Sequence, residues 1–492
     1  MEKFNKNTLD KRKPQHLYVQ LFNIIRDSII KGQLKDHYKL PPIRSLAGQL
    51  EVNNSTVVNA YRLLEKEGYV YKKMGSGTFV SPRLEYDNED VILEKYPAKD
   101  DLKLMDQGQM QIRKDMISFA SATPTPDLFP VEAFKVLLNE VLDRDKGEVF
   151  GYQESQGYFP LRESLTKYLK NYNIETKPEN VQIISGAQQG IDVIAKALVE
   201  YNDRVIVESP TYTGAIGTFR SRGAQIISIP ILEDGIDIKK LEESVKVNKP
   251  KLIYLMPNFQ NPTGYSYSLE KKKKILDIAK KYNILIVEDD YLSDLVFNKR
   301  ENGTLKSLDK DGLVIYIKSF SKIFMPGLRL GFLVMPPRVY HKILRAKHTS
   351  DISTSGLNQR VFDLYLRRDI WKDHIHHMEK IYEERFEVMG KSISKYFSQL
   401  GLEYSIPNGG LNFWFKLPEG LNSDEIYEKA AEKNVLIIPG NIFFPIVNEN
   451  SYFRLSIAAV YPEQIEKGMN ILANIIKGYD KEHIRDYYTP LL

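Results

Sequence analysis

Lys322 stands among residues whose types and spacing suit covalent chemistry. The apolar run 313–317 predicts a buried strand, and small hydroxyl residues surround the lysine that follows it. A lysine at the end of a buried strand is desolvated, which lowers its pKa and makes the neutral amine available to attack an aldehyde. Ser319 and Ser321 can donate hydrogen bonds to a phosphate, and Arg329 can bind one through two N–H groups. The segment therefore predicts a site for an aldehyde that carries a phosphate, although a lone lysine after a strand is more often a solvated loop residue.

Pyridoxal 5′-phosphate (PLP) has both groups, and two further segments carry residues suited to it. Residues 185–190, SGAQQG, open a predicted helix, where free N–H groups around Ala187 and Gln188 and the helix dipole favour a phosphate. Tyr212 follows the predicted strand 204–207 and could stack on a pyridine ring, whereas a tyrosine buried in the core would leave the same pattern. PLP is therefore the cofactor that we expect.

Two longer motifs resemble those of fold-type I aminotransferases, which use PLP. The sequence S-F-S-K-x-x-x-P-G-L-R-x-G at 319–331 is similar to their PLP-lysine motif, and P-N-x-x-N-P-T-G at 257–264 is similar to their cofactor-binding loop. The resemblance implies that Asn261 and Tyr291 contact the phenolic oxygen of PLP. It also implies that Asp289 faces the pyridine nitrogen and keeps it protonated, because the cationic ring is the electron sink.

Two other segments extend the resemblance. Residues 152–162 are similar to the motif Y-x-x-x-x-G-x-x-x-L-R of the same aminotransferases, which implies that Tyr152 reaches the phosphate of a neighbouring subunit in a homodimer. Residues 452–456, YFRLS, resemble a strand that carries a carboxylate-binding arginine, which gives the role of clamping a substrate carboxylate to Arg454.

Strands and helices alternate from about Met116 onward, which predicts an α/β fold. We expect a large, mostly parallel seven-stranded sheet with the ligand at the carboxyl ends of its strands, and a smaller α+β subdomain near the C-terminus. The predicted strands are 181–184, 204–207, 224–229, 252–256, 285–287, 314–317 and 332–334.

The first 80 residues predict a different kind of domain. Apolar residues recur at helical spacing in three segments, and Ser55 could cap the third helix. Two β-branched or aromatic runs, 69–72 and 78–80, flank a glycine-rich tip and predict a hairpin. Three helices and a hairpin form a winged helix-turn-helix, which would present the start of the third helix to the DNA major groove. A small helical bundle with an attached hairpin is the alternative.

The amino-acid sequence of this segment resembles the GntR-type winged helix over its full length. The resemblance places Arg44, Thr56 and the wing glycine Gly77 at DNA-contacting positions, and Asn54 and Ser55 lie with Thr56 at the start of the third helix. The position of Asn54 is often arginine in this family. Because asparagine can contact adenine or phosphate, DNA binding remains expected while the operator sequence stays open.

Charge and composition support two domains. Residues 1–80 contain 14 Lys and Arg against 7 Asp and Glu, a net charge of +7, while the rest of the chain carries −2 of the total of +5. A basic segment joined to a near-neutral body suggests a nucleic-acid module. We predict domains at 1–81 and 115–492, joined by a linker at 82–114 with at most a short helix around 90–95. No apolar run reaches the length of a membrane span, and the absence of cysteine and of a signal peptide points to the cytoplasm.

The two resemblances together are those of the MocR/GabR type of bacterial transcriptional regulator. This family implies a domain-swapped, head-to-tail homodimer bound to double-stranded operator DNA. An amino compound would displace Lys322, form an external aldimine with PLP and alter promoter binding.

A working aminotransferase with an accessory DNA-binding domain is the alternative, because no catalytic residue is missing. The GABA-sensing type has a second arginine shortly after the stacking tyrosine, whereas residues 213–215 here are Thr-Gly-Ala. The effector could therefore be an α-amino acid, another amine or PLP itself. We predict no metal site, because His374, His376 and His377 have no evident convergent ligand.

Overall fold

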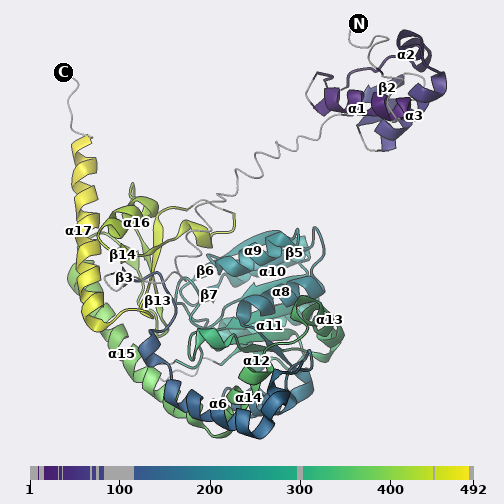
Figure 1. The fold of residues 1–492 in the computed structure, drawn as a ribbon. Helices are drawn as coiled ribbons and strands as arrows, with labels where there is room; N and C mark the ends of the chain where they lie inside the picture. Colours follow the sequence, from purple (N-terminus) through teal and green to yellow (C-terminus); the bar gives the residue numbers. More distant parts are fainter. Residues whose placement is uncertain are drawn as a thin grey trace. The chain divides into compact units, whose positions relative to one another are not determined.

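The structure is a computed structural model that describes residues 9, 16–30, 33–35, 37–66, 69–73, 77–81, 116–295, 303–446 and 449–486 (Figure 1). The chain divides into two compact units, residues 1–100 and 101–492, which are described separately. The predicted linker at 82–114 and the short helix expected around 90–95 lie outside the described residues. The boundaries of the two domains therefore stay predictions.

The N-terminal unit is the expected winged helix. Its core consists of apolar side chains from three helices and the two strands of a hairpin, among them Leu21, Leu46, Val57 and Val80. The hairpin is antiparallel, with Val70 opposite Val80. The elements are α1 (Leu17–Ile30), α2 (Ile43–Leu50), α3 (Asn54–Lys66), β1 (Val70–Lys73) and β2 (Gly77–Val80).

The start of α3 lies two residues before the predicted one, which placed the cap at Ser55. The helix begins at Asn54, and the Thr56 N–H donates to the Asn53 carbonyl at 2.9 Å. Ser55 therefore lies in the first turn and does not cap the helix. The sequence does not show which residue caps the helix, because Asn53, Asn54 and Ser55 are all favourable capping residues.

The second unit is built on a large mixed sheet. Its strand order is β4-β11-β10-β9-β8-β5-β6-β7. The five strands from β10 to β6, together with β4 and β11, include all seven predicted strands, and the pairs among β10, β9, β8, β5 and β6 are parallel. Strand β11 runs antiparallel to both its neighbours. The bounds are β4 (Val181–Ile184), β5 (Arg204–Ser209), β6 (Gln225–Leu232), β7 (Gly235–Ile236), β8 (Leu252–Leu255), β9 (Leu285–Asp290), β10 (Val314–Ser319) and β11 (Gly331–Val334).

Strand β7 is an eighth strand that the sequence analysis missed. It pairs antiparallel with the end of β6 across the tight turn at Glu233 and Asp234. Two residues are too few to leave a hydrophobic period, so only the register of β6 defines this strand.

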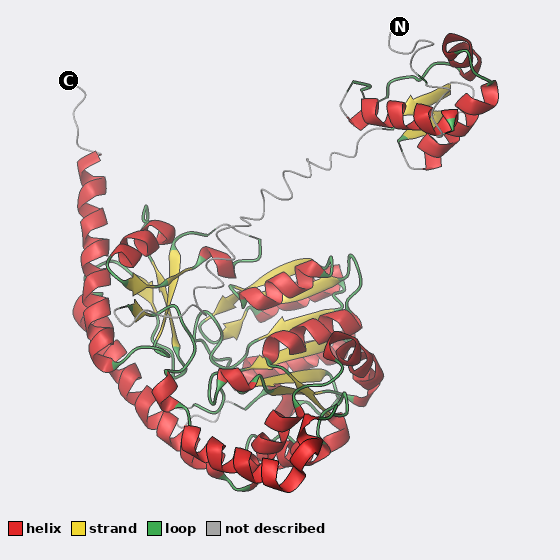
Figure 2. Ribbon diagram, viewed as in Figure 1, coloured by secondary structure: helices red, strands yellow, loops and turns green. Residues whose placement is uncertain are grey.

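Apolar side chains cover both faces of this sheet, as expected for parallel strands. Along β5, Val205 and Val207 pack in one cluster while Ile206 packs in another with α10 and α11. Helices surround the sheet (Figure 2). They are α6 (Val131–Asp145), α7 (Phe159–Lys170), α8 (Ala187–Leu198), α9 (Thr213–Ser221), α10 (Ile238–Asn248), α11 (Leu269–Tyr282), α12 (Leu305–Leu308), α13 (Tyr340–Asp351) and α14 (Gly356–Arg367).

A smaller α+β subdomain follows the large sheet. Its antiparallel sheet has the order β12-β13-β16-β15, and the long helix α15 packs against α17 beside it (Figure 1). Strand β14 pairs with β3, so the segment that begins the described part of this unit belongs to the subdomain. The bounds are β3 (Ile117–Ser118), α15 (Ile370–Tyr396), β12 (Glu403–Tyr404), β13 (Asn412–Lys416), α16 (Ser423–Glu432), β14 (Val435–Leu436), β15 (Ile438–Pro439), β16 (Tyr452–Ser456) and α17 (Pro462–Asp486).

The fold class is therefore confirmed in both units. Among the described residues, no helix combines the length and the apolar character needed to cross a bilayer.

Candidate functional site

Lys322 lies just beyond β10, at the carboxyl end of the large sheet. Its Nζ is 3.4 Å from the Thr123 hydroxyl, on the segment that leads out of the subdomain. Burial, reinforced by the nearby guanidinium groups of Arg454 and Arg329, lowers the pKa of Lys322 to about 8. The neutral amine, which is the nucleophile toward an aldehyde, is therefore far more populated near neutral pH than in an ordinary lysine.

The residues expected to bind phosphate gather at the ends of three adjoining strands. Ser319 on β10 is paired with Gly331 on β11, which is paired with Ile184 at the end of β4. Arg329 donates from Nη2 to the Ser185 carbonyl at 2.5 Å. The hydroxyl of Ser319 accepts the Ser321 N–H at 3.3 Å.

The N-terminus of α8 opens beside this guanidinium. Gly186 has φ of 101°, and a Cβ there would lie 2.9 Å from Nη2 of Arg329. No side chain caps the helix, which begins at Ala187. A twelve-residue helix with an uncapped N-terminus beside an arginine is suited to an anion.

Gln188 is held by side chains on α9 and by Tyr212. Its Nε2 donates to the Thr218 hydroxyl at 2.8 Å, and its Oε1 accepts from the Tyr212 hydroxyl at 3.1 Å. The side chain of Gln188 is therefore engaged with Tyr212, and only its backbone N–H points along the helix axis toward an anion. Burial, with Asp289 as a smaller cause, raises the pKa of Tyr212 to about 12.

Asp289 is the penultimate residue of β9 and is buried. Its Oδ2 accepts a hydrogen bond from the Tyr254 hydroxyl at 2.7 Å, while its Oδ1 has no partner among the described residues. Burial raises the pKa of Asp289 to about 7. An unsatisfied buried carboxylate oxygen is costly, and a protonated pyridine nitrogen is a donor that would satisfy it. The carboxylate thus fits the cofactor that the sequence predicts.

Arg454 lies on β16 and faces the same site. Its Nη1 donates to Oδ1 of Asn261 at 2.8 Å and its Nη2 donates to the Ala120 carbonyl at 2.6 Å. No carboxylate pairs with it within the part of the chain that the structure describes, and its Nε has no partner there. Burial lowers the pKa of Arg454 to about 10. A buried guanidinium of this kind is suited to bind a carboxylate from a ligand.

Tyr291 lies between the loop of Asn261 and the small sheet. Its hydroxyl donates to the Phe259 carbonyl at 2.6 Å and accepts from Nδ2 of Asn412 at 3.0 Å. Burial raises the pKa of Tyr291, so this hydroxyl stays protonated. The structure therefore brings Asn261, Tyr291 and Arg454 together, as the sequence predicted, while their contacts with a ligand stay predictions.

Sequence reasoning missed four residues of this site: Ala120, Thr123, Tyr254 and Asn412. Ala120 contributes only its carbonyl oxygen, which no side-chain pattern can indicate. Tyr254 had a usable signal, because it precedes the 257–264 loop on a strand and shares a sheet face with Asp289 by alternation.

Tyr152 lies outside the site of its own chain. Its side chain is 87% exposed, and Phe150 nearby is 74% exposed. This position is compatible with the predicted contact to a neighbouring subunit, which stays a prediction.

Three of the predicted DNA-contacting residues line one groove of the winged helix. Arg44, Asn54 and Thr56 line a groove of about 740 Å³ between α2 and the start of α3. Ser55 is exposed beside them, and Gly77 at the start of β2 is exposed with φ of 123°. The groove combines a cation with amide and hydroxyl groups at a helix N-terminus, a combination suited to DNA phosphates.

Of the three histidines on α15, His374 is buried in the core, whereas His376 and His377 are exposed. Nε2 of His374 is 2.8 Å from the Ile323 carbonyl, and the ring of His374 stacks on Phe324. The described residues contain no group of three potential metal ligands.

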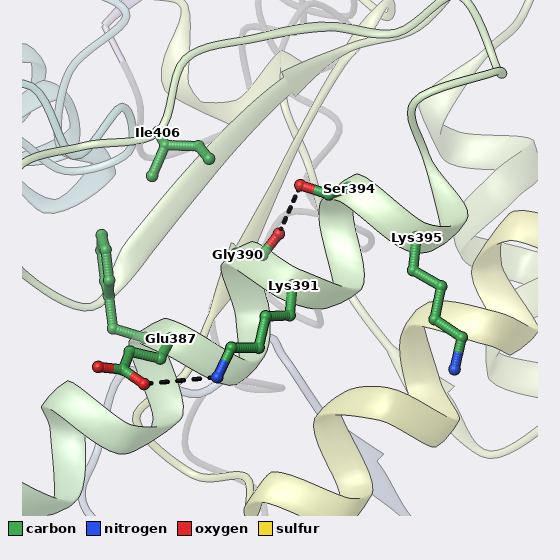
Figure 3. Close-up of a pocket in the computed structure, with 7 residues that line it drawn as sticks. Glu387, Gly390, Lys391, Ser394, Lys395 and Ile406 are labelled. Atoms are coloured by element: carbon green, nitrogen blue, oxygen red, sulfur yellow. Dashed lines mark hydrogen bonds and ion pairs between the residues drawn. The ribbon is translucent and has the colours of Figure 1, made fainter.

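A second groove, of about 670 Å³, lies on α15 away from this site (Figure 3). Ser394 and Gly390 are hydrogen-bonded on its floor, and Lys391 pairs with Glu387 at 3.6 Å. None of the predicted site residues lines it. Its lining residues are Phe386, Glu387, Gly390, Lys391, Ser394, Lys395 and Ile406.

The fold and the site define a PLP-binding domain of the aminotransferase type joined to a winged helix. Residues 114–472 match the model of the aminotransferase class I and II family, and residues 17–80 match that of the bacterial regulatory proteins of the gntR family. The chain belongs to the aminotransferase class I and II family and carries a GntR-type helix-turn-helix domain.

The proteins similar to this chain include both aminotransferases and regulators. The chain is 34% identical to the 2-aminoadipate transaminase of Thermus thermophilus over 74% of its own length and 91% of the relative's. It is 28% identical to the probable rhizopine catabolism regulatory protein MocR of Rhizobium meliloti, over 94% of each chain. The crystal structure of Pyrococcus horikoshii kynurenine aminotransferase in complex with PMP superposes with a TM-score of 0.74 at 31% identity, covering 80% of this chain and 97% of that one.

The full-length match with a regulator and the two-domain architecture identify the chain as a transcriptional regulator of the MocR type, with PLP as its cofactor. When bound, PLP supplies an aldehyde carbon that reacts with amines and a ring that withdraws electrons. Lys322 would hold the aldehyde end, Asp289 the pyridine nitrogen, and Arg329 with the start of α8 the phosphate.

Proposed function

We propose that the aminotransferase-like domain is a sensor in which an amino compound replaces Lys322 at the cofactor and changes the affinity of the winged helix for its operator. The observation that carries this proposal is Arg454, a buried guanidinium without a carboxylate partner in the described structure, in the same site as a lysine of lowered pKa. An amine and a carboxylate on one small ligand would meet these two groups at once.

The proposed roles of the remaining site residues follow from their positions. Asn261 and Tyr291 face the cofactor's phenolic oxygen, and Tyr212 stacks on its ring. Ser319, Ser321 and the first N–H groups of α8 at Ala187 and Gln188 bind the phosphate with Arg329. On the DNA side, Arg44, Asn54, Ser55, Thr56 and Gly77 contact the operator.

We further propose a head-to-tail homodimer with domains at 1–81 and 115–492 and a linker at 82–114. Exposed apolar side chains around α6 support a subunit interface, among them Val136 at 61%, Phe150 at 74% and Tyr152 at 87% exposure. A dimer would present two winged helices, and Tyr152 would complete the phosphate site of its partner. As a DNA-binding regulator, the protein would act in the cytoplasm, where the chromosome lies.

A working aminotransferase remains a second candidate, because the sequence lacks none of the catalytic residues that the family resemblance implies and the 2-aminoadipate transaminase is 34% identical. The two uses require opposite kinetics. A sensor must retain its ligand, whereas an enzyme must remove the α-proton and release a product.

One experiment separates the two functions. Amino compounds are screened for a change in the visible spectrum of the PLP-bound protein, and each active compound is tested for operator affinity and for turnover with a keto acid. The proposal expects a spectral change that accompanies a change in operator affinity with little turnover. Rapid multiple turnover with unchanged operator affinity would favour the enzyme.

A further inference from the structure

Lys318 is a fully buried lysine four residues before Lys322, and the site described above does not use it. Its side chain is completely inaccessible at the end of β10. A buried ammonium is costly unless it is paired and hydrogen-bonded. Its surroundings should therefore show what the charge does.

Two carboxylates face this ammonium. Nζ of Lys318 is 2.5 Å from Oδ2 of Asp294 and 3.4 Å from Oδ2 of Asp290. Although burial alone would lower the pKa of Lys318, the two carboxylates raise it above its ordinary value. The pKa of Asp290 is lowered despite burial, chiefly because of Lys318. Lys318 therefore forms buried ion pairs with both Asp290 and Asp294.

Tyrosine hydroxyls complete the cluster. Tyr316 on β10 donates to Oδ2 of Asp290 at 2.6 Å. Tyr168 on α7 and Tyr172 in the turn that follows it both donate to Oδ1 of Asp294. On α15, Glu379 is near enough to Asp294 to be affected by its charge, and His376 pairs with Glu379 at 3.8 Å.

This cluster lies directly behind Asp289. Lys318 and Asp290 are register partners on the parallel strands β10 and β9, and Asp289 is the preceding residue on β9. Successive strand residues face opposite sides of a sheet, so Asp289 faces Tyr254 and the cofactor site while Asp290 faces Tyr316 and Lys318. One strand end thus places two carboxylates next to each other, and only one of them has a counterion.

The ion pair affects Asp289 in two ways. An uncompensated anion at Asp290 would favour the protonated form of Asp289, which could no longer hold a protonated pyridine nitrogen. Asp290 also accepts the Ser293 and Leu292 N–H groups at 3.0 and 3.3 Å, and this turn carries Tyr291. Asp290, the partner of Lys318, therefore bears both on the protonation of Asp289 and on the turn that carries Tyr291.

We propose that Lys318 is a positioning residue for the cofactor ring: its ion pair with Asp290 offsets the negative charge behind Asp289, so that Asp289 stays ionised and holds the pyridine nitrogen protonated. This proposal rests on the assignment of Asp289 to that nitrogen. It goes beyond the proposed sensor function, because it would apply equally if the protein were an enzyme.

The test uses the full-length protein loaded with PLP and follows the pH midpoint of the visible band of the cofactor bound to Lys322. A protonated pyridine nitrogen lowers that midpoint. Lys318→Met should therefore raise it by about one unit and weaken PLP binding roughly tenfold. Lys318→Arg retains the charge and should keep the midpoint near that of the parent.

Asp290→Asn removes the anion of the pair, whereas Lys318→Met removes the cation. It therefore tests the proposal even if Lys318→Met does not fold. It removes the anion next to Asp289 and should lower the midpoint, while the double variant Lys318→Met/Asp290→Asn should return it toward the parent value. Unchanged midpoints in both single variants, or the same direction of change in both, would overturn the proposal. A parent protein without any Lys322-dependent visible band would instead refute the cofactor assignment itself.

Discussion

Lys322 and Asp289 have opposite pKa changes with the same physical cause. Burial disfavours the charged form of each, so the pKa of Lys322 falls to about 8 and that of Asp289 rises to about 7. Both groups are therefore held near the pH at which small changes in their surroundings alter their protonation. A ligand that bonds to one and pairs with the other would relieve both desolvation costs.

Asp289→Asn should stabilise the cofactor-free protein above pH 7. Because the folded-state pKa of Asp289 is raised from 3.8 to about 7, the folded protein binds more protons at this residue than the unfolded chain between about pH 4 and 7. Stability is consequently lost as the pH rises through that window. The variant should gain roughly 2–4 kcal/mol in the free energy of unfolding at pH 8 and little near pH 4, measured by urea unfolding. An equal gain at both pH values would mean that the carboxylate is not the cause.

Arg454→Ala should lose its response to effectors that carry a carboxylate. Removing one partner of a charge-assisted hydrogen bond costs roughly 1.5–3 kcal/mol, which is about ten- to hundredfold in affinity. Titration of the visible spectrum measures this loss, and basal operator binding should not change. An amine without a carboxylate is the matched control ligand, and its affinity should be retained. A response to the carboxylate ligand equal to that of the parent would remove Arg454 from the site.

At the level of residues, the sequence predicted side chains that lie in motifs and missed contacts made by other means. Lys322 and Asn261 stand in patterns long enough to be specific, whereas Asp289 lies in a short acidic run whose role only the family resemblance implied. Thr123 lies in a segment without such a pattern, and its proximity to Lys322 depends on the pairing of β3 with β14. Lys318 was overlooked because the sequence does not show which carboxylates lie near a lysine at the end of an apolar run. Its role can be inferred only once those buried partners are known.

At the level of elements, the phosphate site depends on helix α8 and on the strand ends around it. The sequence predicted both the strand β4 and the helix that follows it, because the change from apolar run to Gly and Gln residues is clear. It could not predict that Gly186 has a positive φ and lies against Arg329. That contact arises from the order β4-β11-β10, which brings residues far apart in the chain together.

Gly186→Ala should weaken PLP binding and destabilise the protein by roughly 1–3 kcal/mol. The new Cβ would meet Nη2 of Arg329 at 2.9 Å, and its backbone conformation disfavours any side chain. Gly217→Ala on α9 is the matched control, because nothing lies within 4 Å of its Cβ and alanine favours a helix. Calorimetry and PLP titration measure both effects. Equal results for the two variants would show that the contact with Arg329 has no importance.

At the scale of the whole molecule, two units of different chemistry share one chain. The N-terminal unit has a groove lined by Arg44, Asn54 and Thr56, and the other unit has the buried site around Lys322. The sequence predicted both kinds of domain from their motifs and from the uneven charge. It could not predict how a change at Lys322 would reach the winged helix, because the residues between the units carry no periodic pattern.

Arg44→Ala should weaken operator binding and reduce its dependence on salt. Each phosphate contact contributes about 0.9 to the slope of log affinity against log salt concentration, so loss of one contact should lower the slope by about one. Anisotropy titrations at several salt concentrations measure this slope. Lys391→Ala on α15 removes the same charge from the other unit and should leave the slope unchanged. Identical slopes in all three proteins would exclude a phosphate contact by Arg44.

The most direct test of the sensor function compares operator affinity in the parent and in Lys322→Ala while a spectrally active amino compound is added. If the ligand acts by replacing Lys322 at the cofactor, the parent should change its operator affinity over the same concentration range as its visible spectrum. Lys322→Ala should bind the operator with its basal affinity and should not respond to the compound. A response of Lys322→Ala equal to that of the parent would contradict the proposed function.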